Sequence, residues 1–383
     1  MISTRFTHLA LENWRNFRVV DVDLAPRVFV AGPNASGKTN FLDAFRFLHD
    51  IAQTEGSVAR AVSVRGGFSR IRSLHAHGPK QRVRVQVALV IKNGTWEYEL
   101  VLDATKASPP RVFRERVAQN GIEVLLRPNE RDLKDPRLCE QTHLEQLSQN
   151  GAFRDLVEAL ASVQHVHVVP QVAKASIGLD GALLREAPGS DFIEQIARLN
   201  KRRQKSMVAQ IGKLLKVAVP KFSELKVTRD KVGRPHIEAL YSHWRPGGAH
   251  QREADFSDGT LRLLGFLFAM LNGTAPLIVE EPELSLHREV VRQIPRLMAA
   301  ASVARARQVM ISTHAEEALS DTGIDPAEIL ILTPTDDETL VEVGSSDRYL
   351  VESARKRVPL GPLVVARTRP TDIEQLSLRF EGR

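Results

Sequence analysis

Alternating apolar and polar positions recur along the first third of the chain and predict hairpins of an antiparallel sheet. The alternating segments are residues 6–11 and 19–24, on either side of a turn at 12–17, and residues 83–91 and 96–102. Asn93-Gly94 between the last two is a dipeptide typical of tight hairpin turns. A further hairpin is expected over residues 111–126, around Asn120-Gly121.

Short apolar runs of a second kind predict buried strands of a parallel sheet. Residues 28–30 form one such run, and a helical pattern follows at 40–48. Two more runs, 277–283 and 309–313, end in polar or acidic side chains, and residues 261–271 form a helix that is apolar nearly all round and therefore buried. The fold class is thus α/β, with an antiparallel sheet beside a parallel one.

The middle of the chain lacks recognisable chemistry and is expected to be a compact helical insertion with one hairpin. Helices are predicted at residues 144–163, 191–197 and 205–217, and frequent prolines and glycines exclude a long coiled coil. The expected division of the chain is an N-terminal lobe at 1–103, the insertion at 104–251, a C-terminal lobe at 252–345 and a tail at 346–383.

Composition is that of a globular protein of 383 residues with a net charge of +7, which favours an anionic partner. Residues 198–234 carry twelve Lys or Arg against two acids, so this segment is either a DNA or RNA backbone contact or a solubility feature. No apolar run is long enough to span a membrane and the start lacks a secretion signal, so a cytoplasmic location is expected. The single cysteine, Cys139, excludes an internal disulfide.

Residues 32–39 match the phosphate-binding P-loop pattern G-x-x-x-x-G-K-[ST], in the strand, loop and helix context that it requires. Its glycines allow backbone N–H groups to point at the phosphates of a nucleotide. Lys38 would reach the β- and γ-phosphates, and the Thr39 hydroxyl would bind Mg²⁺. The residues expected to bind the nucleotide here are Gly32, Pro33, Asn34, Ala35, Ser36, Gly37, Lys38, Thr39 and Asn40.

Three further motifs follow in the C-terminal half. Ser257-Asp258-Gly259 precedes the buried helix, where taken alone it is a good N-cap. Glu280 and Glu281 end an apolar strand, which is the layout of a Walker B strand. His314 ends the next strand, at the edge where ligands bind in open α/β sheets, and Thr313 and Glu316 fit a capping box for a following helix.

Together these motifs resemble the ABC-type P-loop ATPases, and among them the RecF, OLD and SMC-like group of bacterial AAA family ATPases, here without a long coiled coil. The resemblance covers about the first 100 residues and residues 255–343. It implies that Lys38 and Thr39 bind phosphates and Mg²⁺, that Glu280 supports Mg²⁺, that Glu281 is the general base and that His314 contacts the γ-phosphate. Ser257 and Gly259 would act in trans, on ATP held between two copies in a head-to-tail homodimer.

The sequence departs from this group at three points. Glu280 stands where Asp is usual, and Ala35 replaces a usual Gly. The glutamine expected after the first helix is not identifiable, with Gln81 and Gln86 as guesses. Paired acids of a fused nuclease are not recognisable, so a separately encoded effector protein is expected.

Two functions remain open from the sequence. The first is an ATP-hydrolysing, DNA-associated ATPase in genome maintenance or in defence against phage or plasmids. The alternative is a nucleotide-gated dimeric scaffold that holds or releases a toxin or nuclease, with slow hydrolysis. An import or export ATPase is disfavoured because no L-S-G-G-Q motif is present, and no membrane partner is expected.

Overall fold

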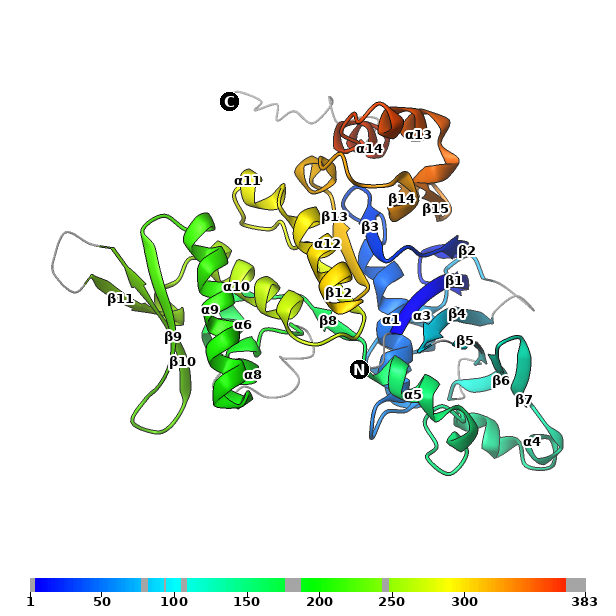
Figure 1. Ribbon diagram of the computed structural model, residues 1–383. Coiled ribbons are helices and arrows are strands. Elements are labelled where there is room, and N and C mark those ends of the chain that lie inside the picture. Colours follow the sequence, from blue (N-terminus) through cyan, green and yellow to red (C-terminus); the bar gives the residue numbers. More distant parts are fainter. Residues whose placement is uncertain are drawn as a thin grey trace, which may run out of the picture.

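The computed structural model describes residues 4–76, 82–92, 94–104, 109–175, 187–242 and 248–369. Within them the chain forms three sheets with helices between and around them (Figure 1). The helices are α1 (Lys38–Ala52), α2 (Val58–Ser63), α3 (Phe68–Ile71), α4 (Glu130–Lys134), α5 (Arg154–Ala161), α6 (Pro170–Ala175), α8 (Phe192–Arg198), α9 (Lys201–Ala218), α10 (Asp258–Leu271), α11 (Arg288–Val291), α12 (Ile294–Arg305), α13 (Arg348–Arg355) and α14 (Gly361–Thr368). None of the helices in the described ranges is long and apolar enough to cross a membrane.

The first sheet is antiparallel and contains the hairpins that alternation predicts. In spatial order its strands are β2 (Phe17–Asp23), β1 (Thr4–Trp14), β4 (Val83–Ile91), β5 (Gly94–Asp103), β6 (Arg111–Gln119) and β7 (Ile122–Arg127). Strands β5 and β6 pair from Trp96 opposite Gln119 to Asp103 opposite Arg111, with one shift of register between Val101 and Leu102. The expected boundary between residues 103 and 104 therefore falls between two paired strands of one sheet.

The second sheet brings together segments from distant parts of the chain. Its order is β15 (Thr339–Val343), β14 (Ile329–Pro334), β3 (Arg27–Ala31), β13 (Val309–Thr313), β12 (Leu277–Glu280) and β8 (Gln164–Val166). All neighbours are parallel except β15, which pairs antiparallel with β14. The three strands expected from their apolar runs, β3, β12 and β13, are adjacent, so their carboxyl ends meet at one edge.

Helix α1 lies between these two sheets and fixes the position of the loop that precedes it (Figure 1). Phe41, Phe45 and Leu48 on its apolar face are fully buried. The ring of Phe45 packs edge-on against Phe6 of β1, with centroids 4.9 Å apart. Because α1 is held by this core, Lys38 at its first turn projects from a rigid base.

The insertion differs from the compact helical lobe that we expected. It contains a three-stranded antiparallel sheet, in the order β11 (Ala249–Arg252), β10 (Pro235–Tyr241) and β9 (Phe222–Arg229), against which α9 packs. The predicted helix at 144–163 is only α5, preceded by a short 3-10 turn at Gly151–Phe153, because Asn150 and Gly151 interrupt the helical pattern. The other two predicted helices are present as α8 and α9.

The described part of the tail packs onto the core through α13 and α14. Leu350, Leu360 and Val364 are buried in the same apolar cluster as strands β12 and β13. Gly361 lies so close to the segment after β13 that a Cβ there would be 2.2 Å from the Glu316 carbonyl oxygen. This tight contact joins the tail to the segment that carries His314.

Candidate nucleotide site

The P-loop backbone has the conformation that its glycines predict. Gly37 has φ +91° and caps α1, and a Cβ at this position would lie 2.2 Å from Asn16 Nδ2, so a larger residue cannot fit without displacement. Ala35 also adopts a left-handed φ of +63°, a conformation that favours the usual glycine. The Lys38 ammonium is buried and donates hydrogen bonds to the carbonyl oxygens of Gly32 (3.0 Å) and Pro33 (2.9 Å). Burial lowers the pKa of Lys38, while the nearby Glu281 opposes that shift.

Asn16, which the sequence interpretation assigned only to a hairpin turn, supports this loop. Its amide nitrogen donates to the Ser36 carbonyl (3.2 Å) and to Thr339 Oγ1 (2.8 Å), and its oxygen accepts from Asn40 Nδ2 (2.7 Å). These bonds connect the β1–β2 turn, the P-loop and β15. The sequence marked Asn16 only as a polar residue in a turn. Its partner Ser36 lies 20 residues further along the chain, so the contact could not be predicted locally.

Thr39 and Glu280 meet where the P-loop helix faces the end of β12. The Thr39 hydroxyl donates to Glu280 Oε2 at 2.7 Å, and His165 Nε2 donates to Glu280 Oε1, also at 2.7 Å. Burial opposes ionisation of Glu280, but the bonds from His165 and Thr39 outweigh it and hold the pKa of this carboxyl below its usual value. The longer arm of Glu in place of Asp therefore still reaches Thr39.

This pair of oxygen ligands fits Mg²⁺, which prefers hydroxyl, carboxylate and phosphate oxygens and usually takes only one or two protein carboxylates. Within the described residues no cluster of three or more His, Cys, Asp or Glu side chains could hold a metal by itself. A magnesium ion here would depend on nucleotide phosphates for further ligands, as the P-loop arrangement provides.

Lys38, Glu281 and His314 come together at the same edge of the sheet, as the sequence predicts. Glu281 Oε1 lies 3.9 Å from Lys38 Nζ and 3.7 Å from His314 Nδ1, distances of electrostatic pairs rather than hydrogen bonds. Interaction with His314, joined by Lys38, lowers the pKa of Glu281, and the same interaction raises the pKa of His314. At neutral pH Glu281 is therefore an ionised carboxylate at a partly exposed position.

Glu283 anchors this arrangement, a role that the motif did not reveal. Its Oε1 accepts hydrogen bonds from Thr313 Oγ1 (2.8 Å) and from the His314 backbone N–H (3.0 Å), and lies 3.4 Å from His314 Nδ1. The expected capping box is wrong, because Thr313 bonds to Glu283 and no side chain caps the 3-10 helix Glu316–Leu319. Burial raises the pKa of Glu283.

The Ser257-Asp258-Gly259 turn begins α10 and lies outside this cluster of contacts. Ser257 is exposed and caps the helix by accepting a hydrogen bond from the Thr260 N–H at 3.2 Å. A Cβ at Gly259 would lie 2.3 Å from the Ser285 carbonyl oxygen. Glycine is thus required for the close approach of this turn to the segment after β12.

Gln86, one of the two guessed glutamines, does not lie at the site. Gln86 is in the antiparallel strand β4, where its side chain bonds to Arg84, and Gln81 lies outside the described residues. A third glutamine, Gln171, lies in the first turn of α6, shortly after β8, the strand that carries His165. Its side chain approaches Asp258 Oδ2 at 3.4 Å. No sequence pattern marks this glutamine, because the placement of β8 beside β12 depends on tertiary pairing.

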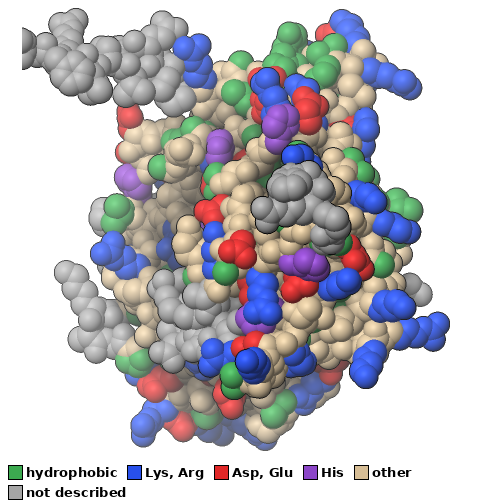
Figure 2. All heavy atoms as spheres, turned by 90° about the vertical axis from the view of Figure 1, so that its left-hand side faces the viewer, with side chains coloured by type: hydrophobic (Ala, Val, Ile, Leu, Met, Phe, Trp, Pro, Cys, Tyr) green, Lys and Arg blue, Asp and Glu red, His purple; other side chains and the backbone are tan. Residues whose placement is uncertain are grey.

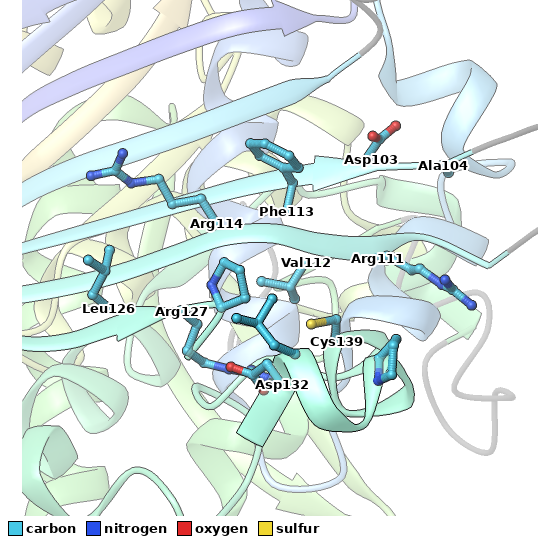
Figure 3. A pocket seen from close by; sticks show the side chains of 13 residues that line it. Asp103, Ala104, Arg111, Val112, Phe113, Arg114, Leu126, Arg127, Asp132 and Cys139 are labelled. Atoms are coloured by element: carbon cyan, nitrogen blue, oxygen red, sulfur yellow. Dashed lines mark hydrogen bonds and ion pairs between the residues drawn. The ribbon is translucent and has the colours of Figure 1, made fainter. Parts of the chain in front are cut away.

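A cavity lies away from the P-loop, between the β6–β7 hairpin and α4 (Figure 3). It has a volume of about 690 Å³ and shares no residue with the P-loop edge. Arg127 and Asp132 point toward each other at its floor, joined at 2.6 Å, and Cys139 lies beside them in a 3-10 helix. Arg127 and Asp132 are bonded to each other and, through Glu115, belong to a structural network.

Comparisons with known proteins agree with this geometry. A family model described as "AAA domain, putative AbiEii toxin, Type IV TA system" matches residues 27–320. No curated protein matches the chain. Among solved structures, an SMC head bound to the C-terminal winged-helix domain of ScpA has a TM-score of 0.52 at 14% identity, and covers 88% of this chain and 96% of its own.

Two further SMC head domains are similar in fold, each at 12% identity and a TM-score of 0.50. One is from Pyrococcus furiosus, with an extended coiled coil and bound to the C-terminal domain of ScpA; the other is from Pyrococcus yayanosii. Each alignment covers 92% of this chain, together with 100% of the Pyrococcus furiosus chain and 98% of the Pyrococcus yayanosii chain. We conclude that the chain belongs to this AAA domain family and has the fold of an ABC-type P-loop ATPase of the SMC and RecF-like group.

Proposed function

We propose that the protein binds ATP with Mg²⁺ and hydrolyses it to ADP and phosphate. The observation that carries this proposal is the convergence of Lys38, Glu281 and His314 with the Thr39–Glu280 pair at one sheet edge. Bound Mg²⁺ would neutralise charge on the phosphates. The residues of the chain would orient the nucleotide and the attacking water around it.

In this proposal each side chain has a distinct task. The Lys38 ammonium exchanges its loop carbonyls for phosphate oxygens. Glu281, kept ionised by His314 and Lys38, accepts a proton from the attacking water. His314, anchored through its backbone by Glu283, donates a hydrogen bond to the γ-phosphate.

Substitution of Glu281 tests this assignment. Glu281→Gln keeps the shape of the side chain but removes the base, so ATP binding should persist while hydrolysis slows about 10²–10⁴-fold. Phosphate release and equilibrium nucleotide binding measure the two effects separately. Lys38→Ala is the matched control and should lose binding itself, and full hydrolysis by Glu281→Gln would remove Glu281 from this role.

We further propose that two copies hold ATP between them, with Ser257 and Gly259 of one copy facing the nucleotide of the other. Support comes from the exposure of Ser257 at the start of a buried helix, where its N–H groups could meet an anion. Light scattering with and without ATP tests this proposal. We expect the Glu281→Gln variant to dimerise when ATP is added, and the Ser257→Arg variant to remain monomeric.

The partner that such a dimer serves is proposed to be a separately encoded toxin or nuclease, in defence against phage or plasmids or in DNA maintenance. The family description, which names a type IV toxin–antitoxin system, supports the defence setting. In the scaffold alternative, Glu281→Gln traps the effector and Lys38→Ala never binds it. Equal behaviour of the two variants in a pull-down would exclude the gated scaffold.

DNA is a second candidate partner, favoured by a basic groove between α9 and β9. The groove has a volume of about 560 Å³, and four lysines line it: Lys205, Lys213, Lys216 and Lys226. Among the described residues only Lys226 has a carboxylate partner, Glu224 at 2.9 Å. On the face that carries this subdomain, Lys and Arg side chains are widespread, although Asp and Glu lie among them (Figure 2). The unpaired lysines are therefore the residues that we assign to phosphate contact.

A further inference from the structure

His165 contacts the carboxylate assigned to Mg²⁺ from a strand that no motif marks. Strand β8 runs parallel to β12, with His165 in register with Ile278. Residues in register on parallel strands share a face, and Glu280 follows Ile278 by two positions, so His165 and Glu280 also share it. Side-chain placement follows from strand pairing, which brings positions 115 residues apart into contact.

The two oxygens of Glu280 have separate partners. Oε1 accepts from His165 Nε2 and Oε2 accepts from Thr39 Oγ1, each at 2.7 Å. The imidazole is the donor because an ionised carboxylate has no proton to give. The side chain of His165 is 9% exposed, and its Nδ1 is buried without a partner in the described part of the chain. Burying an imidazole with one unsatisfied nitrogen costs folding free energy. The bond from Nε2 to the Glu280 carboxylate is the contact that this buried position provides in return.

Glutamate has one more rotatable bond than aspartate, so its carboxylate needs an additional restraint to remain in a single orientation. His165 supplies this restraint through Oε1, the oxygen that Thr39 does not contact. We propose that His165 is a positioning residue that holds Oε1 of Glu280, so that Oε2 stays directed at Thr39 and at the divalent cation the two residues would share. This inference rests on the proposed ATPase function and adds a residue to its metal site.

The test compares metal affinity with nucleotide affinity in the full-length protein. Mn²⁺ binding in the presence of a non-hydrolysable ATP analogue is measured by electron paramagnetic resonance, and analogue binding is measured separately in EDTA. In H165F, which lacks the donor, Mn²⁺ affinity should fall about tenfold, in the range found for partners of metal ligands. Nucleotide affinity in EDTA should not change.

Two further variants complete the experiment. H165Q places an amide N–H near the position of Nε2 and should recover most of the Mn²⁺ affinity, whereas H165N is too short and should not. If H165F does not fold, the H165Q and H165N pair gives the same comparison. The control H167F lies two residues along and has only an electrostatic influence on Glu280, with no hydrogen bond to it among the described residues. This variant should bind Mn²⁺ like the wild type at pH 8.

The outcomes separate the inference from the proposed function. Unchanged Mn²⁺ affinity in H165F, or an equal fall of Mn²⁺ and metal-free nucleotide affinity, overturns the positioning role. A wild-type protein that binds no nucleotide at all overturns the ATPase proposal itself. Loss of Mn²⁺ affinity in H165F with recovery in H165Q supports both.

Discussion

Two clusters of charged side chains in this molecule differ in how completely their members are bonded. Arg127 is almost fully buried and binds Glu115 at 3.2 Å and Asp132 at 2.6 Å. Glu115 also accepts the N–H groups of His143 and Leu144, at 2.8 and 3.1 Å. The second cluster, here called the P-loop cluster, consists of Lys38, Glu281 and His314. Glu281 lies 3.9 Å from Lys38 and 3.7 Å from His314, and both Glu281 and His314 are partly exposed.

The difference separates a structural use of charge from a functional one. A closed network in which each charge is bonded holds a single conformation, and it has nothing left to offer a ligand. The looser cluster keeps Glu281 and His314 accessible, at 29% and 39% exposure, so their charges can act on a bound molecule. We therefore expect substitutions in the first cluster to change stability and substitutions around the second to change binding and hydrolysis.

The largest effect on stability should follow Arg127→Met. This change leaves Glu115 and Asp132 buried without their cation, which typically costs about 3–5 kcal/mol. Urea unfolding measures the loss, and nucleotide affinity of the folded protein should stay the same. The matched control is Arg116→Met on the neighbouring strand β6, where the more exposed pair with Glu97 should contribute less than about 1 kcal/mol. Equal losses in both variants would contradict the distinction between the clusters.

A smaller effect, confined to the P-loop cluster, should follow Asn16→Ala. The change removes the bonds to the Ser36 carbonyl and Thr339 and frees Asn40, so the loop is no longer held in its phosphate-binding shape. We expect ATP affinity to fall about tenfold, equivalent to about one to two hydrogen bonds. Isothermal titration calorimetry measures it. Asn13→Gly in the same hairpin is the control, and a similar loss there would point to the hairpin as a whole.

Asn16 also illustrates what the sequence could and could not predict. The P-loop, the strands on which it depends and the helix after it follow from local periodicity and from residue types that a phosphate requires. The partners of those residues do not, because Asn16 with Ser36 and His165 with Glu280 meet only through tertiary pairing. Strand β8 has three residues, too few for a detectable period, and β6 joined the antiparallel sheet across a connection that carries no pattern.

The basic groove gives a third prediction, intermediate between the two clusters. Its Lys213 and Lys216 have no carboxylate partner among the described residues and do not belong to the nucleotide site. If Lys213 and Lys216 contact phosphates, duplex affinity should fall steeply between about 50 and 200 mM salt. The double change to Gln should weaken binding and reduce the slope of log affinity against log salt by up to about two. Fluorescence anisotropy measures both. Lys356→Gln, already paired with Glu352, is the control, and no duplex binding at low salt would exclude the groove as a DNA site.

The smallest effect concerns pH and tests whether the looser cluster contributes to stability at all. The pKa of His314 is raised in the fold by Glu281 and Glu283, so the protonated form is the one stabilised. Its contribution is complete below the unfolded value of about 6.5 and is lost as pH rises through the higher folded value. The difference in melting temperature between wild type and His314→Ala should therefore be larger at pH 6 than at pH 8.5. The effect should be small, because the imidazole is partly exposed and solvent screens its charge. A difference in melting temperature that grows with pH would contradict the pairing of His314 with these carboxylates.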